Sequence, residues 1–152
     1  MSINMEKIKK LRDETGAGIL EIKKMLEQVG EDTKKAKEEL LKKSAAKAEK
    51  KSDRVAGDGL VFSYIHNSGK VGSLVILACE TDFVAKTEDF KNLCKEVAMQ
   101  VCTEDYENTK SLLESEYIRD PSKKIIDLVN EATAKVGEKI EIKKFVKFTV
   151  GE

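Results

Sequence analysis

The sequence predicts an α+β fold, in which an N-terminal three-helix bundle precedes a small three-stranded antiparallel sheet with helices on one face. Three observations support this prediction. Apolar residues recur at helical spacing over the first 45 residues, β-branched and aromatic runs follow from residue 58, and helical spacing returns before a last alternating run. We therefore expect a bundle at 1–45, a basic helical linker at 46–57 and an α+β core at 58–152.

The bundle is predicted from three short helices that glycine-containing segments separate. Residues 5–15 form the first helix, which ends at 15–18, Thr-Gly-Ala-Gly, because glycine adopts positive φ without strain. The segment 30–33, Gly-Glu-Asp-Thr, ends the second helix and starts the third, with Asp32 or Thr33 as its N-cap. The expected inward residues are Ile8, Leu11, Ile19, Ile22, Leu26, Val29, Ala36 and Leu40.

Charge is divided unevenly along the chain, although the formal net charge is +0. Residues 1–54 contain 15 basic and 11 acidic side chains, and the run from Lys42 to Arg54 is basic and poor in large apolar residues. A protein that binds a duplex on its own is usually distinctly basic, so we expect no direct contact with nucleic acid. We interpret the basic run as a solvated helix face, with RNA or an acidic partner as the alternative.

The core is predicted from strand and helix patterns in turn. A strand at 60–65 and a hairpin turn at 67–70 lead to a second strand at 71–79, which is apolar on both faces and therefore expected to be buried. Residues 103–118 favour no element. One helix is expected around Phe90, Leu93, Val97 and Val101, and another starts at Asp120-Pro121, carries Ile125, Val129, Ala132 and Val136, and ends at Gly137. A last strand is expected with Ile140, Ile142, Val146, Phe148 and Val150 on its apolar face, and with Lys144 and Phe145 out of the pattern.

The residues that usually carry enzyme chemistry are sparse. The cysteines Cys79, Cys94 and Cys102 form no CxxC pair, and their odd number favours a reducing compartment over a disulfide framework. Together with His66 they lack the closely spaced pairs of a zinc site. We therefore expect no catalytic residue, no metal and no cofactor, and an enzyme built on Cys79 or Cys94 is the weakest alternative.

Nothing in the sequence predicts a membrane protein. The longest apolar run, Leu74 to Cys79, is too short to cross a bilayer. Acidic residues at Glu6, Asp13 and Glu14 do not suit a signal or transit peptide. We expect a cytoplasmic location, with an organelle matrix as the alternative.

The segment Glu80 to Val84 joins the second strand to the following helix. In one interpretation Thr81 or Asp82 caps that helix while Phe83 and Val84 pack inward. In the other, Phe83 projects from a rigid turn as an anchor for a partner, since interface energy concentrates in such aromatic residues. The residues alone favour the first interpretation.

Four stretches of the chain, in order, carry a family resemblance. Leu11 to Leu26, with its Thr-Gly-Ala-Gly block, closely resembles the N-terminal signature of the bacterial elongation factor Ts family, the exchange factors for elongation factor Tu. The hairpin Gly59 to Glu80 and the block Thr81 to Lys86 also agree, as does Asp120 through Lys123 with Phe145 through Glu152. The resemblance implies a bundle like that of ubiquitin-associated domains. Such bundles often bind protein surfaces, so the alternative function is a small adaptor that binds a partner without affecting its nucleotide.

The resemblance also implies a mechanism and its residues. In the family the bundle docks on the nucleotide-binding domain of elongation factor Tu, and the turn enters near the Mg2+ and phosphate site to promote GDP release and exchange for GTP. By position, Asp82 and Phe83 would intrude there, framed by Thr81 and Val84. The bundle contacts would come from Arg12, Ile19 and Leu20.

One departure from the family concerns the middle of the chain. Family members usually carry a longer helical insert, and some carry a second core subdomain or a coiled coil, where this chain has the short segment 103–119. Secondary contacts to elongation factor Tu would then be lost. A single core subdomain in place of two favours a homodimer.

Overall fold

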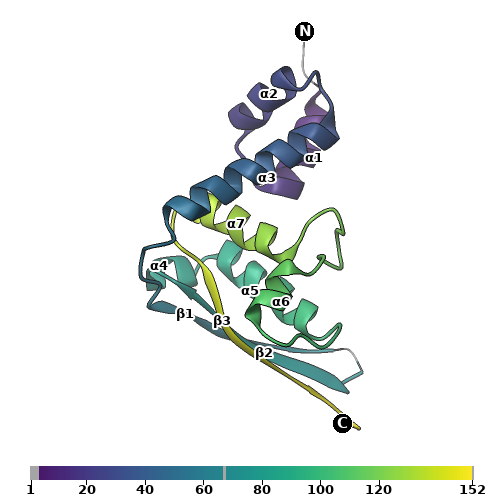
Figure 1. Cartoon of the computed structure of the whole chain (residues 1–152), viewed down its shortest axis with the longest axis vertical. Coiled ribbons are helices and arrows are strands. Elements are labelled where there is room, and N and C mark those ends of the chain that lie inside the picture. Colours follow the sequence, from purple (N-terminus) through teal and green to yellow (C-terminus); the bar gives the residue numbers. More distant parts are fainter. Residues whose placement is uncertain (1–3, 67, 152) are drawn as a thin grey trace.

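The computed structural model describes residues 4–66 and 68–151, and it confirms the α+β class. Helices α1–α3 form one end of the molecule, the sheet lies at the other end, and α5–α7 lie between them (Figure 1). No helix of this described part has the length and apolar character needed to cross a bilayer. The elements are α1 (Met5–Thr15), α2 (Ile19–Gln28), α3 (Thr33–Lys50), β1 (Asp58–Ile65), β2 (Val71–Cys79), α4 (Asp82–Ala85), α5 (Glu88–Val101), α6 (Thr109–Glu114), α7 (Ile125–Val136) and β3 (Glu141–Thr149).

The bundle has its own small apolar core, as the helical spacing predicts. Gly16 ends α1 in the left-handed conformation, and Gly30 has a positive φ beyond the end of α2. Asp32, one of the two expected caps, accepts hydrogen bonds from the backbone amides of Lys34 and Lys35. The buried side chains of this core are Ile8, Leu11, Ile22, Met25, Leu26, Ala36 and Leu40.

Helix α3 connects the bundle to the core. It continues to Lys50, so the first part of the segment expected as a linker is helical, and it packs along α7 (Figure 1). Lys37 on α3 reaches across this junction. Its Nζ lies 2.8 Å from Asp120 Oδ2 in the core and 3.6 Å from Glu14 Oε2 in α1. The ion pairs and the helix packing together hold the bundle on the core.

The sheet has the strand order β1-β2-β3, and both strand pairs are antiparallel. His66 and Val71 close the β1–β2 hairpin through a backbone hydrogen bond of 2.9 Å, while Asn67 of the predicted turn lies outside the described residues. Helix α5 covers one face of the sheet and buries Phe90, Leu93, Val97 and Val101, which confirms the predicted stripe.

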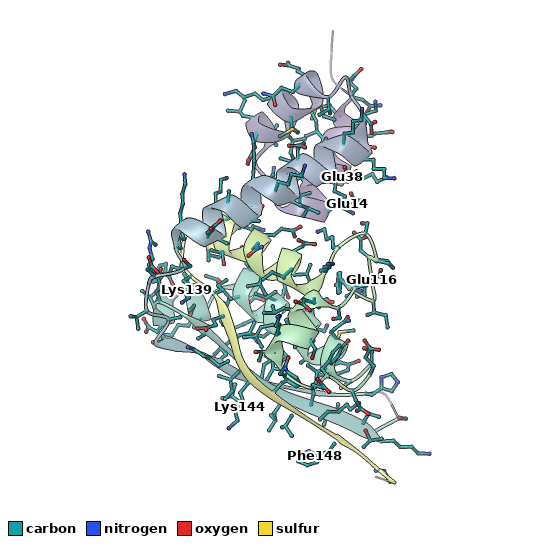
Figure 2. All side chains as sticks on the ribbon, viewed as in Figure 1. Glu14, Glu38, Glu116, Lys139, Lys144 and Phe148 are labelled. Atoms are coloured by element: carbon teal, nitrogen blue, oxygen red, sulfur yellow. The ribbon has the colours of Figure 1, made fainter. Side chains whose placement is uncertain are left out.

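The other face of the sheet carries apolar side chains that no described element covers. The prediction that β2 is buried on both faces is wrong, because Leu74 and Ile76 point away from the helices and are exposed. The strand register places these two beside Val61 of β1 and Val146 of β3. Lys144 and Phe148 lie on the same outer side (Figure 2). This outer sheet face therefore consists of Val61, Ser63, Ile65, Gly72, Leu74, Ile76, Lys144, Val146 and Phe148.

A β-bulge changes the face that β3 presents. The register shifts between the pairs Leu77–Ile142 and Ile76–Lys144, so β3 has one extra residue there. Ile142 packs on the helix side, but beyond the bulge Phe145 takes that side and Phe148 turns outward. The expectation of one continuous apolar face on this strand is therefore wrong. The bulge also explains the two residues that did not fit the alternation.

Helix α7 begins later than the sequence predicts. Asp120-Pro121 forms a turn in which Asp120 Oδ1 accepts hydrogen bonds from the backbone amide and the hydroxyl of Ser122. This local bonding competes with helix formation, and α7 starts at Ile125. Its end at Gly137, in the left-handed conformation, is confirmed. The ambiguous region 103–118 contains the short helix α6, whose capping residue is Asn108.

Beneath the α3–α7 junction, Glu131 and Lys123 form a buried ion pair. Lys123 Nζ lies 2.7 Å from Glu131 Oε1 and donates a hydrogen bond of 3.0 Å to Oε2. Burial raises the pKa of Glu131 to about 7, and this outweighs the attraction of Lys123, which lowers it. Nearby Asp127 adds to the increase.

This raised pKa predicts a pH-dependent stability. The native carboxyl of Glu131 binds its proton more tightly than the unfolded chain does, so the free energy of unfolding falls as pH rises from about 4.5 to about 7. The loss is on the order of 3 kcal/mol. In Glu131→Gln the side chain cannot titrate, so this contribution to the slope should be absent. Urea unfolding between pH 5 and pH 8 measures both slopes, and parallel slopes would contradict the assignment.

A second carboxyl group at this junction, that of Asp120, titrates at a lower pH than Glu131 does. Burial alone would raise the pKa of Asp120, but hydrogen bonds from Lys37 and Ser122 outweigh it and lower the pKa to about 2. Its stabilising contribution is present above pH 4 and is lost as pH falls toward 2. The two carboxyl groups can therefore be distinguished by pH.

Candidate partner interface

The most exposed aromatic side chain of the described residues lies at the turn between β2 and α5. Phe83 belongs to the short helix α4 and is 81% exposed. Thr81 is the N-cap of this helix, and its hydroxyl accepts a hydrogen bond of 3.3 Å from the backbone amide of Val84. Val84 is buried in the core beneath the turn. The interpretation in which Phe83 also packs inward is therefore excluded by its exposure.

Asp82 is exposed beside Phe83 and adds a negative charge to the same projection. Its carboxylate lies 3.3 Å from the ammonium group of Lys86, one helical turn away. Both side chains are well exposed, so this pair stabilises the turn very little. The Asp82 carboxylate can therefore leave Lys86 and pair with a group of a partner at a small cost in free energy.

The turn is held from a distant part of the chain. The carboxylate of Glu138, in the connection between α7 and β3, accepts hydrogen bonds from the backbone amides of Glu80 and Thr81 at 3.1 and 3.0 Å. It also accepts one of 2.7 Å from the hydroxyl of Thr81. Sequence analysis missed Glu138, because no local pattern marks a residue that bonds to a site 57 positions away.

The three bundle residues named in the sequence analysis lie around the Gly-Ala-Gly turn between α1 and α2. Leu20 is 74% exposed, and Ile19 at 38% is partly covered. The prediction that Ile19 faces inward is wrong, because it is exposed and lies outside the buried core of the bundle. Val29, which was also expected to face inward, is only partly buried. Arg12 is exposed on the last turn of α1.

A hollow lies between the bundle and the core. Its volume is about 440 Å³, and it is lined by Arg12 and the 16–18 turn of the bundle and by Asp89 and Lys135 of the core. Asp89 lies in the first turn of α5, just after the turn that carries Phe83, and its carboxylate is 3.1 Å from Lys135 Nζ. None of the described residues that line the hollow belongs to the turn that carries Phe83, and Asp89 is the lining residue nearest to it in sequence.

The geometry offers little for covalent chemistry. Burial raises the pKa of Cys94 to about 12 and also raises the pKa of Cys79, to which Glu138 contributes through its charge. These thiols therefore remain protonated near neutral pH, and a protonated thiol is a poor nucleophile. Among the residues that the structure describes, no group of three or more His, Cys, Asp or Glu side chains could hold a metal ion.

Comparison with known proteins agrees with the resemblance of the four stretches. The family model described as elongation factor TS matches residues 80–152, which include the turn and Glu138. Elongation factor Ts of Coprothermobacter proteolyticus is 39% identical, with 100% of both chains covered. The chain belongs to the elongation factor Ts family. Elongation factor Ts proteins of Petrotoga mobilis, at 39% identity over 100% of both chains, and Thermotoga petrophila, at 38% over 100% of this chain and 98% of the relative, agree.

This chain lacks an internal stretch of residues that its relatives have. The alignment with the Coprothermobacter protein runs over 197 positions and covers both chains completely, whereas this chain has 152 residues. The relative therefore carries internal residues that have no counterpart here.

Proposed function

We propose that this chain is a guanine nucleotide exchange factor, which binds elongation factor Tu in its GDP-bound state and promotes exchange of GDP for GTP. Its membership of the elongation factor Ts family supports this proposal. The observation that carries it is the exposure of Phe83 on a turn that is fixed from below by Val84 and from the side by Glu138. The expected location is the cytoplasm, with an organelle matrix as the alternative.

The turn and the bundle have different tasks in this proposal. Arg12, Ile19 and Leu20 provide affinity for the nucleotide-binding domain of elongation factor Tu. Phe83 then inserts into an apolar gap of that domain, where burial of a benzyl ring contributes about 2–3 kcal/mol. Asp82 enters beside the Mg2+ and phosphate site and disturbs the groups that hold the metal. GDP is then released faster, because its diphosphate loses part of its attraction to Mg2+.

Such a factor needs no chemistry of its own. It acts through a coupling free energy between its own binding and that of GDP. If the factor weakens GDP binding tenfold, GDP weakens binding of the factor tenfold, and the coupling free energy is about 1.4 kcal/mol. The overall equilibrium between GDP and GTP is unchanged. A cofactor, a metal or a covalent intermediate is not required for this function.

The proposed function is tested with fluorescent GDP bound to elongation factor Tu and an excess of unlabelled GDP. Release should accelerate with increasing concentration of this chain and reach a plateau. Binding to elongation factor Tu without acceleration would contradict exchange activity and favour a simple adaptor. A steep salt dependence of RNA binding would instead favour a role for the basic run at 42–54.

We further propose that two copies of the chain associate through the outer sheet face. The sheet has a helical layer on one side, and on the other side the exposed residues Leu74, Ile76 and Phe148 form a contiguous apolar surface. A hollow of about 450 Å³ on this face is lined in part by Ile65 and Val150. Large exposed apolar patches commonly mark association sites, and an identical face on a second copy would supply the missing layer.

A further inference from the structure

One carboxylate outside the partner surface bonds to the backbone that presents Phe83. Glu138 Oε1 accepts from the amides of Glu80 and Thr81, and Oε2 accepts from the hydroxyl of Thr81. All three distances lie between 2.7 and 3.1 Å. Hydrogen bonds to an ionised acceptor are stronger than those between neutral groups. The start of the turn is therefore fixed by a single side chain.

The bonds continue from Glu138 into the turn itself. The Thr81 hydroxyl, which donates to Glu138, also accepts from the Val84 amide at 3.3 Å and so closes the first turn of α4. Phe83 lies within this turn. A helix of four residues is far too short to be stable alone, so its geometry depends on such external bonds.

Glu138 is itself held at a fixed position. The preceding residue, Gly137, ends α7, and its carbonyl accepts a hydrogen bond of 3.2 Å from Arg54. The following residue, Lys139, donates one of 2.8 Å to the carbonyl of Ser52, and Figure 2 shows Lys139 beside the end of α3 and the strands near α4. The connection carrying Glu138 is thus tied on both sides to the segment that follows α3.

We propose that Glu138 is a positioning residue for nucleotide exchange, which holds the Thr81–Val84 turn so that Phe83 and Asp82 point outward before a partner binds. The inference rests on the proposed exchange function. Glu138 acts through Thr81 and does not touch the partner. Ordering the turn in advance removes an entropic cost from the step in which Phe83 is inserted.

The test compares Glu138→Ala with Glu141→Ala in full-length protein. Glu141 is a matched control, because it lies three residues further along and pairs with Lys143 on the surface. The maximal rate of fluorescent GDP release at saturating factor should fall about tenfold in Glu138→Ala and remain unchanged in Glu141→Ala. The concentration for half-saturation should change little, because the bundle residues are intact.

A double-variant cycle separates positioning from general stability. If Glu138 acts through Phe83, then Glu138→Ala should cost almost nothing further in a Phe83→Ala background. Glu138→Gln keeps an acceptor for the two amides and should retain several-fold more activity than Glu138→Ala. It also serves as the test variant should the alanine variant fail to fold.

The outcomes distinguish this inference from the proposed function. If the unmodified chain accelerates release and both Glu138 variants match it, the positioning role is wrong while exchange activity stands. If Glu138→Ala lowers the maximal release rate by the same factor with Phe83 and with Phe83→Ala, the positioning role is likewise wrong. If the unmodified chain does not accelerate release, the exchange function itself fails. Amide hydrogen exchange at residues 81–85 of the free chain should be about tenfold faster in Glu138→Ala, and unchanged exchange would overturn the positioning role independently of elongation factor Tu.

Discussion

Phe83→Ala should reduce the maximal GDP release stimulated by this chain about 30-fold, while the chain remains folded. The benzyl ring is 81% exposed in the free protein and contributes little to its core, so the substitution leaves no internal cavity. In the complex the same ring is expected to fill an apolar gap. Loss of such an aromatic anchor commonly costs about 2 kcal/mol or more, which corresponds to that factor in rate.

A matched control for this prediction is Phe148→Ala. Phe148 is also an aromatic residue with high exposure, 71%, but it lies on the outer sheet face. Its removal should leave the maximal release rate unchanged when the factor is saturating. Thermal unfolding of both variants checks that the fold is intact. Equal rates for Phe83→Ala and the unmodified chain would exclude the inserted ring as the cause of release.

The second large effect is expected from Leu74→Glu, which places a carboxylate near the middle of the outer sheet face. Leu74 is 45% exposed in one chain, so the substitution is tolerated by the isolated fold. In a dimer the charge would be buried among apolar side chains, which costs several kcal/mol. The dissociation constant should therefore rise about 100-fold or more.

Analytical ultracentrifugation over a range of protein concentrations measures this change. Leu20→Glu is the control, because Leu20 is also an exposed leucine but lies on the bundle. It should leave the dimer unchanged and weaken binding to elongation factor Tu. A monomeric unmodified chain at high concentration, or a dimeric Leu74→Glu variant, would contradict association through this face.

Local patterns in the sequence were sufficient for the helices with a clear apolar stripe. Ile22 and Leu26 in α2, and Phe90 and Val97 in α5, are buried as their spacing predicts. The reason is that a helix of this kind has one face to bury, and periodicity alone identifies it. The motif around Thr81 could likewise be located from the sequence, because capping residues and an adjacent aromatic residue are close together in the chain.

Features that depend on distant parts of the chain could not be predicted in the same way. The two-sided apolar pattern of β2 does not indicate whether a second layer covers Leu74 and Ile76, since that depends on the arrangement of layers. The bulge between Ile142 and Lys144 left a visible break in the alternation, but its effect on the face of Phe148 follows only from the pairing with β2. Glu138 reaches the turn through three-dimensional proximity alone.

We propose that the turn promotes GDP release by disturbing the Mg2+ and phosphate site of elongation factor Tu. This claim is tested most directly by measuring fluorescent GDP release with and without this chain, first in excess Mg2+ and then with the metal removed by a chelator. Strong acceleration in Mg2+ is expected, together with a much smaller one after chelation, because the chain and the chelator would relieve the same restraint. An equal acceleration under both conditions would contradict the claim.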